Sequence, residues 1–246
     1  MPKIEAEPRA PGQPRTPPQF AIDAVMRRRG RVRVFEHLDP DAMALLVIDM
    51  QEFALAPGSP VEVPAARAIV PTLNRLAGAC RRRGVPVIWV THATLPGGVD
   101  WLLFFDNFML PDVRQGSIRA LEQGSEGTRI YRELEVAPGD VRVEKCRFSA
   151  FSPGASRLDL VLRSLHRDTV IVTGTKTNIC CESTARDAMM LDYKVIFVSD
   201  GTAASTDWEH EATLANICQN FGDVMEADEL IALFHTPAHA REGAAR

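Results

Sequence analysis

The sequence predicts an α/β protein of three layers (α/β/α), in which helices cover both faces of a six-stranded parallel sheet. Short apolar runs alternate with amphipathic helical segments along most of the 246 residues. The apolar runs are continuous and rich in β-branched residues, which is typical of strands buried on both faces. Strands and helices that alternate in this way indicate a Rossmann-like parallel sheet.

The first predicted strand is the apolar run Ala44–Asp49. The other five strands are expected at 86–91, 141–145, 169–173, 194–199 and 223–226. Apolar residues recur at helical spacing over Arg67–Arg83, and Gly84 is well suited to end that helix. Further helices are expected at about 156–166, 180–192, 207–221 and 228–234.

The chain ends are expected to lie outside the α/β domain, which we assign to residues 41–236. Six prolines within residues 1–19 predict a disordered or surface-draped arm. Residues 20–40 form an N-terminal extension, in which Phe20–Met26 could add a short amphipathic helix, and residues 237–246 form a C-terminal tail. The arm either has no function or packs on a neighbouring subunit.

The composition excludes several function classes. A net charge of −4 favours neither a nucleic-acid nor a membrane partner, and no apolar stretch approaches the roughly 18–20 residues that span a bilayer. The first 20 residues do not resemble a signal peptide, so a cytoplasmic location is expected. The five cysteines show neither C-x-x-C spacing nor a nearby histidine at zinc-ligand spacing, so we expect no disulfide framework, metal or other cofactor.

Active sites of parallel sheets form at the carboxyl ends of the strands. Here those ends carry Asp49, His92, Lys145, the loop after Thr173, and Asp200. The long segment 95–127 has the length of a lid. It carries four aromatic residues that either wall a pocket or belong to the core of a short helix: Trp101, Phe104, Phe105 and Phe108.

Cys180 lies at the turn between a predicted strand and a predicted helix. The positive end of the helix dipole and the aligned backbone N–H groups there are expected to lower the pKa of a thiol and to hold an oxyanion. Asp49 could accept the thiol proton, and Lys145 could stabilise both charged groups. The three residues together therefore predict nucleophilic catalysis.

Three motifs resemble those of the isochorismatase-like cysteine hydrolases. They are Asp49-Met-Gln51, Lys145, and the stretch from Gly174 to Ala188 that contains Thr177-Asn178-Ile-Cys180. That superfamily includes N-carbamoylsarcosine amidohydrolases, ureidoacrylate and biuret hydrolases, maleamate amidohydrolases, nicotinamidases and isochorismatases. The segment Lys145–Phe151 resembles the corresponding stretch of the ureidoacrylate-hydrolase branch.

The resemblance implies the isochorismatase-like hydrolase fold and a role for each motif residue. Cys180 takes the position of the nucleophile and Cys181 that of a neighbouring valine, with Asp49 and Lys145 completing a catalytic triad. It further implies a cis peptide between Thr175 and Lys176, and an oxyanion hole made by the backbone N–H groups of Lys176 and Cys180. A homo-oligomer, dimer or tetramer, is implied as well.

The implied activity is cleavage of a C–N bond in a small amide, ureido or N-carbamoyl compound through a thioester. A vinyl-ether hydrolase and a non-catalytic binding protein remain as alternatives. A nicotinamidase is disfavoured because no histidine for its Asp-x-His metal set occurs over Asp49–Arg67. His92 is expected to be structural, so its replacement should cost little.

The candidate substrate-binding residues are polar or aromatic side chains on or beside these motifs. For Arg147 a solvated position or an ion pair is an equal alternative, and for Gln219 a helix-end surface position. The candidates are Gln51, Phe53, Trp101, Phe105, Arg147, Phe151, Asn178 and Gln219.

Overall fold

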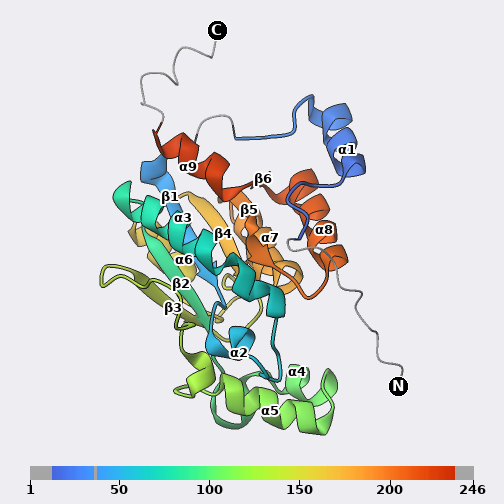
Figure 1. The fold of residues 1–246 in the computed structure, drawn as a ribbon, viewed down its shortest axis with the longest axis vertical. Coiled ribbons are helices and arrows are strands. Elements are labelled where there is room, and N and C mark those ends of the chain that lie inside the picture. Colours follow the sequence, from blue (N-terminus) through green and yellow to red (C-terminus); the bar gives the residue numbers. More distant parts are fainter. Residues whose placement is uncertain (1–12, 36–37, 236–246) are drawn as a thin grey trace.

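In the computed structural model, which describes residues 13–35 and 38–235, six parallel strands form a single sheet (Figure 1). The order of the strands is β3-β2-β1-β4-β5-β6. Their bounds are Met43–Ile48 (β1), Val87–His92 (β2), Val141–Lys145 (β3), Thr169–Thr175 (β4), Lys194–Ala203 (β5) and Asp223–Met225 (β6). The predicted three-layer α/β/α class with six parallel strands is confirmed.

Both faces of the sheet are buried, because alternate side chains of each strand point to opposite faces. In β1, Leu45 and Val47 belong to a core shared with α3 (Val70–Arg82) and α9 (Ala227–His235). Leu46 and Ile48 belong to the opposite core. That second core is shared with α6 (Leu158–Ser164), α7 (Glu182–Met190) and α8 (Asp207–Asn216).

The carboxyl ends of β1 and β4 are the natural place for a site, because the strand order changes direction between these two central strands. The two backbones approach closely there. Gly174 has φ 112°, and a Cβ atom at this position would lie 2.0 Å from the Ile48 carbonyl oxygen. Only glycine fits where the two backbones approach so closely. The chain continues from Gly174 into the loop that carries Cys180.

The segment between β2 and β3 forms a helical layer beside the carboxyl end of the sheet. It contains α4 (Leu102–Asn107) and α5 (Pro111–Leu121), which lie near α2 (Glu52–Leu55) in Figure 1. Short 3₁₀ turns occur at Pro40–Ala42, Pro64–Ile69, Pro96–Trp101 and Glu126–Thr128. Phe105 is fully buried with Ile118 and Leu121, so this aromatic residue belongs to the core of the layer.

Several element boundaries differ from the prediction. The helix expected over 67–83 begins as a 3₁₀ turn and becomes α-helical at Val70, with Pro71 in its first turn, where no N–H is needed. The helices expected at 180–192 and 207–221 include π-helical turns, Thr177–Cys181 before α7 and Ile217–Phe221 after α8. Hydrophobic periodicity does not distinguish such turns from α-helix.

Residues 13–35 are attached to the C-terminal half of the domain. The Gln13 side-chain amide donates to the Ala204 carbonyl (3.1 Å) and accepts from the Ala204 N–H (2.9 Å). The expected N-terminal helix is present as α1 (Gln19–Arg29), and the Asp223 carboxylate accepts from the N–H groups of Val34 and Phe35. Residues 1–12 of the predicted arm and the predicted tail lie outside the described residues. No described helix is long and apolar enough to cross a membrane.

Candidate active site

Asp49 follows β1 directly and turns the chain at the carboxyl end of the sheet. Its φ of 52° lies in the left-handed region, which aspartate tolerates better than most residues. Its backbone N–H still donates to the Val90 carbonyl of β2 (2.9 Å), so the residue is fixed at the strand end. The side chain is buried.

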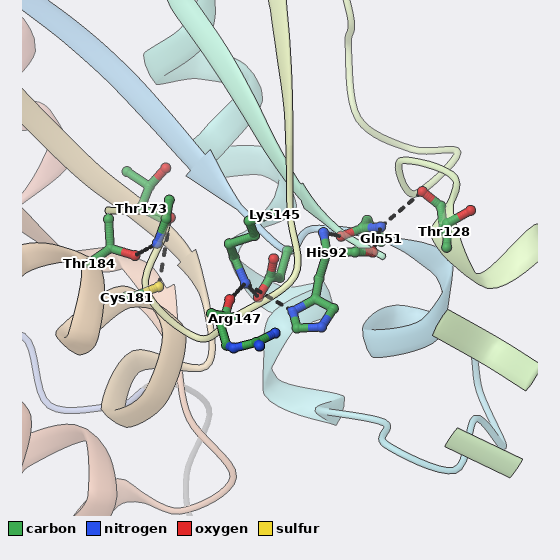
Figure 2. A network of polar contacts seen from close by, with 10 residues as sticks. Gln51, His92, Thr128, Lys145, Arg147, Thr173, Cys181 and Thr184 are labelled. Carbon is green, nitrogen blue, oxygen red and sulfur yellow. Dashed lines mark hydrogen bonds and ion pairs between the residues drawn. The ribbon is translucent and has the colours of Figure 1, made fainter. Parts of the chain in front are cut away.

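Lys145 ends β3, and its buried ammonium group makes three short contacts. Its Nζ lies 2.9 Å from Asp49 Oδ2, 3.0 Å from the Arg147 carbonyl oxygen and 3.1 Å from His92 Nδ1. Figure 2 shows Lys145 between Arg147 and His92. Burial opposes its charge, but Asp49 and Cys180 outweigh burial and raise the pKa of Lys145. Lys145 is therefore a cation at neutral pH, and its three N–H groups are all donated.

The two carboxylate oxygens of Asp49 have different surroundings. Oδ2 accepts from Lys145, whereas Oδ1 is buried and has no hydrogen-bond partner among the residues in the described ranges. Burial raises the pKa of Asp49, and the opposing effects of Lys145 and of the Cys180 thiol are smaller. Oδ1 is thus the oxygen that can receive a proton.

Cys180 lies in the π-helical turn Thr177–Cys181 that follows β4. Burial raises the pKa of its thiol, the neighbouring Asp49 raises it further, and Lys145 opposes both effects. The expectation of a lowered pKa at the helix start is wrong, because burial of the sulfur has the largest effect and raises the pKa. The thiol therefore needs a base to remove its proton.

Cys181 has different surroundings from Cys180. Its side chain is fully buried in the core between the sheet and α7, and its Sγ donates to the Thr173 carbonyl oxygen at 3.7 Å, as drawn in Figure 2. Cys180, by contrast, lines a cavity. Of the two adjacent thiols, Cys180 is the one that a small molecule in this cavity can reach.

The cavity beside Cys180 has a volume of about 190 Å³. Its polar lining consists of Asp49, His92, Thr175, Lys176 and Cys180. The Thr175–Lys176 peptide is cis, as the resemblance implied. The cavity is smaller than the roughly 300–1,000 Å³ of sites for drug-sized ligands, so it suits a small molecule.

The comparison with protein families agrees with this geometry. Residues 43–229 match the family model for the isochorismatase domain. The chain belongs to the isochorismatase family. Among the residues described, no group of three or more His, Cys, Asp or Glu side chains could hold a metal ion.

Several characterised proteins of the family are similar to this chain. Nicotinamidase 3 of Arabidopsis thaliana is 33% identical over 78% of this chain and 89% of its own length. The ureidoacrylate amidohydrolase RutB of Methylobacterium radiotolerans is 30% identical over 84% of this chain and 85% of its own. A crystal structure of a cysteine hydrolase from Pseudomonas syringae pv. phaseolicola is 30% identical, covers 83% of this chain and 97% of its own, and superposes with a TM-score of 0.75.

Of the predicted substrate-binding residues, only Phe53 lines the cavity of this family member. The fully buried Gln51 amide donates to the carbonyls of His92 and Thr128 and accepts from the His92 N–H, so it holds the strand ends together (Figure 2). Phe105 is a core residue of the α4–α5 layer. The assignments of Gln51 and Phe105 as cavity residues are corrected accordingly.

Arg147 and Trp101 contact each other at the margin of the site. The guanidinium donates to the carbonyls of Cys146 (2.7 Å) and Asp100 (2.8 Å) and lies 5.0 Å from the Trp101 ring centre. Arg147 therefore fixes the lid segment to the loop after β3, and neither residue is part of the cavity wall.

Phe151, Asn178 and Gln219 also lie outside the cavity wall. Phe151 packs 5.3 Å from the Tyr193 ring in the core. Asn178 has its Oδ1 buried without a hydrogen-bond partner in the described part of the chain. Gln219 bonds to the Ala215 carbonyl and its own carbonyl accepts from Arg28, so it faces α1. Polarity had suggested Asn178 and Gln219, and the resemblance of the Lys145–Phe151 stretch had suggested Phe151, but neither gives side-chain direction.

Most of the apolar wall was not predicted. Only Phe53 and Phe104 had been singled out, whereas the wall also contains Val61, Val63, Met109 and Phe148. Phe148 lies in the Lys145–Phe151 stretch that resembles the ureidoacrylate-hydrolase branch, so its position in a motif was an available signal. The other three gave no sequence signal beyond hydrophobicity.

His92 has a closer relation to the catalytic residues than the sequence suggested. Burial and the charges of Lys145 and Arg147 lower its pKa well below the ordinary value, so the ring is neutral. Because the Lys145 ammonium can only donate, His92 Nδ1 accepts and the ring proton resides on Nε2. His92 is therefore a positioning residue for Lys145, and the expectation that its replacement costs little needs revision.

We expect the His92→Leu substitution to lower kcat/KM by about 10–100-fold, because one N–H of the buried Lys145 ammonium loses its acceptor. The His92→Asn variant keeps an acceptor oxygen and should retain activity within about tenfold of wild type. Steady-state kinetics on folded variants, checked by circular dichroism, measures both. Equal losses in the two variants would assign His92 a packing role only.

His210 is a second buried histidine, located behind the Cys180 loop. Its Nδ1 lies 2.9 Å from Thr177 Oγ1. Burial lowers its pKa from 6.5 to about 4, against the opposing effects of the Pro14 and Ser199 carbonyls and of Asp207. Between pH 6.5 and about pH 4, His210 is protonated in the unfolded chain but not in the folded one. The free energy of unfolding therefore falls as the pH drops through this range.

We expect His210 to lower the free energy of unfolding by about 2 kcal/mol between about pH 7.5 and 5, since one pKa unit corresponds to about 1.4 kcal/mol. Urea unfolding at the two pH values measures it, and the His210→Asn variant should lose about 2 kcal/mol less than wild type. The matched control is His166→Asn, at an exposed position with φ 54° that asparagine also tolerates. An identical pH dependence in all three proteins would contradict the prediction.

Proposed function

We propose that the protein is a cysteine-dependent amidohydrolase that cleaves the C–N bond of a small linear amide, ureido or N-carbamoyl compound. The observation that carries the proposal is that Asp49 and Cys180 line one small cavity, with Lys145 paired to the Asp49 carboxylate beside it. Two similar proteins carry the names ureidoacrylate amidohydrolase and nicotinamidase, which supports amide chemistry. The scheme uses no metal or cofactor.

The reaction begins with transfer of the Cys180 proton to Asp49 Oδ1 as the sulfur attacks the substrate carbonyl carbon. Transfer accompanies attack because the raised pKa of the thiol disfavours a free thiolate. Lys145 stays protonated and balances the charge that moves between the sulfur and Asp49. We assign the oxyanion to the backbone N–H groups of Lys176 and Cys180.

The second half of the reaction returns the proton. Protonated Asp49 gives its proton to the leaving nitrogen, the C–N bond breaks, and ammonia or an amine departs from a Cys180 thioester. Asp49, again a carboxylate, then takes a proton from water as water attacks the thioester. The C–S bond then breaks, Asp49 gives this proton to the Cys180 sulfur, and the acid product leaves with the thiol restored. A raised pKa suits Asp49 to both the acid and the base step.

Two alternatives make different chemical predictions. A vinyl-ether hydrolase needs no thiol and forms no thioester, and a binding protein releases no product. We would measure ammonia release from a panel of N-carbamoyl amino acids, biuret, ureidoacrylate, maleamate, nicotinamide and simple carboxamides, and quench the reaction in acid for mass spectrometry. Ammonia release with an acyl adduct on the peptide containing Cys180 is expected. Ammonia release without any adduct and unaffected by Cys180→Ala would overturn the proposal, and so would a panel without turnover.

We also propose that the protein forms a homo-oligomer, dimer or tetramer, in the cytoplasm. Leu103, Phe108 and Leu110 on and beside α4 are 67–73% exposed, and such an apolar surface is typical of a contact between subunits. Free cysteines suit a reducing compartment. Light scattering at micromolar concentration tests the first statement, and a monomer mass would reject it.

A further inference from the structure

The wall of the cavity is mostly apolar, whereas the end of the cavity where the reaction takes place carries Asp49 and Cys180. Of the fourteen lining residues in the described part of the chain, nine are apolar, and they come from separate segments. Phe53 belongs to α2, Val61 and Val63 to the loop after it, Phe104 to α4, Met109 to the turn before α5 and Phe148 to the loop after β3. In Figure 1 these helices lie beside the carboxyl end of the sheet. The part of a substrate that does not react would contact hydrocarbon and aromatic rings.

The charges near the cavity are already paired. Asp49 and Lys145 form a buried ion pair, and all three N–H groups of the ammonium are donated. Arg147 is bonded to two backbone carbonyls and stacked on Trp101, outside the wall. Among the described lining residues Lys176 is the only lysine or arginine, and its Nζ lies 3.8 Å from the Glu209 carboxylate.

The remaining polar residues of the described wall, His92, Thr175 and Cys180, add no charge. His92 donates nothing through Nδ1, which accepts from Lys145, and the ring is neutral. A substrate carboxylate placed here would lose its hydration, gain no cation and lie near Asp49. The walls therefore discriminate by charge as well as by size.

We propose that the site selects small amides whose non-reacting part is uncharged and apolar, aliphatic or aromatic, and rejects amides that carry a carboxylate. This inference rests on the proposed amidohydrolase function and narrows its substrate class. It disfavours ureido acids and N-carbamoyl amino acids. A nicotinamidase is disfavoured because its metal-binding histidine is missing, and that argument does not depend on the cavity wall. Neutral aromatic carboxamides therefore fall within the proposed substrate class.

A pair of amides of equal size tests the charge discrimination directly. In 4-methylpentanamide an isopropyl group stands where succinamate has a carboxylate, and the rest of the two molecules is the same. We expect kcat/KM for 4-methylpentanamide to exceed that for succinamate by at least about 100-fold in the wild-type protein. Benzamide provides the aromatic member of the class.

A variant of the wall supplies the second measurement. Val61 is half-buried, so a lysine there can bring an ammonium group to the cavity. We expect Val61→Lys to lower the ratio of the two kcat/KM values at least tenfold, and the unbranched but neutral Val61→Met to leave it within about threefold. A ratio that Lys and Met change equally would contradict charge discrimination by the wall.

The outcomes separate this inference from the function on which it rests. Two results would overturn the inference and keep the amidohydrolase function. One is a higher kcat/KM of the wild-type protein for succinamate than for 4-methylpentanamide. The other is turnover of ureidoacrylate or N-carbamoyl amino acids without any turnover of 4-methylpentanamide and benzamide. No ammonia from any amide of the panel or the pair would reject the function and the inference together.

Discussion

The Cys180→Ala variant is expected to lose turnover by at least about 10⁴-fold, because Cys180 supplies the only thiol among the described residues that line the cavity. The adjacent Cys181 is the matched control. Its sulfur points into the core and donates to the Thr173 carbonyl, so Cys181→Ala should keep kcat within about tenfold of wild type and lower stability instead. Ammonia release under saturating substrate and thermal unfolding of both variants measure these effects.

The opposite pattern would be informative. An active Cys180→Ala together with an inactive, folded Cys181→Ala would make Cys181 the nucleophile and would require the π-helical turn to rotate. Alkylation of the free protein is a weak test, because a buried thiol with a raised pKa reacts slowly even when it is catalytic. Trapping of the acyl group with substrate tests the role of Cys180 under conditions in which Asp49 acts.

The positions of Asp49, Lys145 and Cys180 could be predicted from sequence for a geometric reason. Each lies at or after the carboxyl end of a predicted parallel strand, and the carboxyl ends of parallel strands lie at one edge of the sheet. The strand order thereby brings Asp49 close to Lys145, which is 96 positions further along the chain, and to Cys180, which comes 35 positions after Lys145. The 2.9 Å contact between Asp49 and Lys145 is the result.

The walls of the cavity could not be predicted in the same way. Val61, Met109 and Phe148 lie in irregular segments, where periodicity gives no information about direction. The contacts of Arg147 could not be predicted either. Its guanidinium contacts the Asp100 carbonyl and the Trp101 ring because of where the lid segment packs, which the sequence does not show. The thiol pKa was mispredicted because the helix-end effect is local, whereas burial depends on the whole fold.

The second large effect is expected at Asp49, where Asp49→Asn should reduce kcat by about 10³–10⁴-fold. The amide cannot take the Cys180 proton, and the thiol by itself stays protonated. Asparagine also tolerates the left-handed backbone at φ 52°, so the loss does not come from a distorted turn. The substitution removes the carboxylate that neutralises the buried Lys145 ammonium, and we therefore expect a fall in stability of about 3 kcal/mol.

The double variant Asp49→Asn/Lys145→Met separates catalysis from folding. It removes both members of the buried pair, so most of the lost stability should return while kcat stays as low as in the single variant. Urea unfolding and ammonia release from the same preparations measure the two properties. Recovery of activity along with stability would mean that the ion pair only supports the fold. Loss of activity with restored stability would show that the inactivity of Asp49→Asn does not come from its lower stability, as expected if the carboxylate moves the proton.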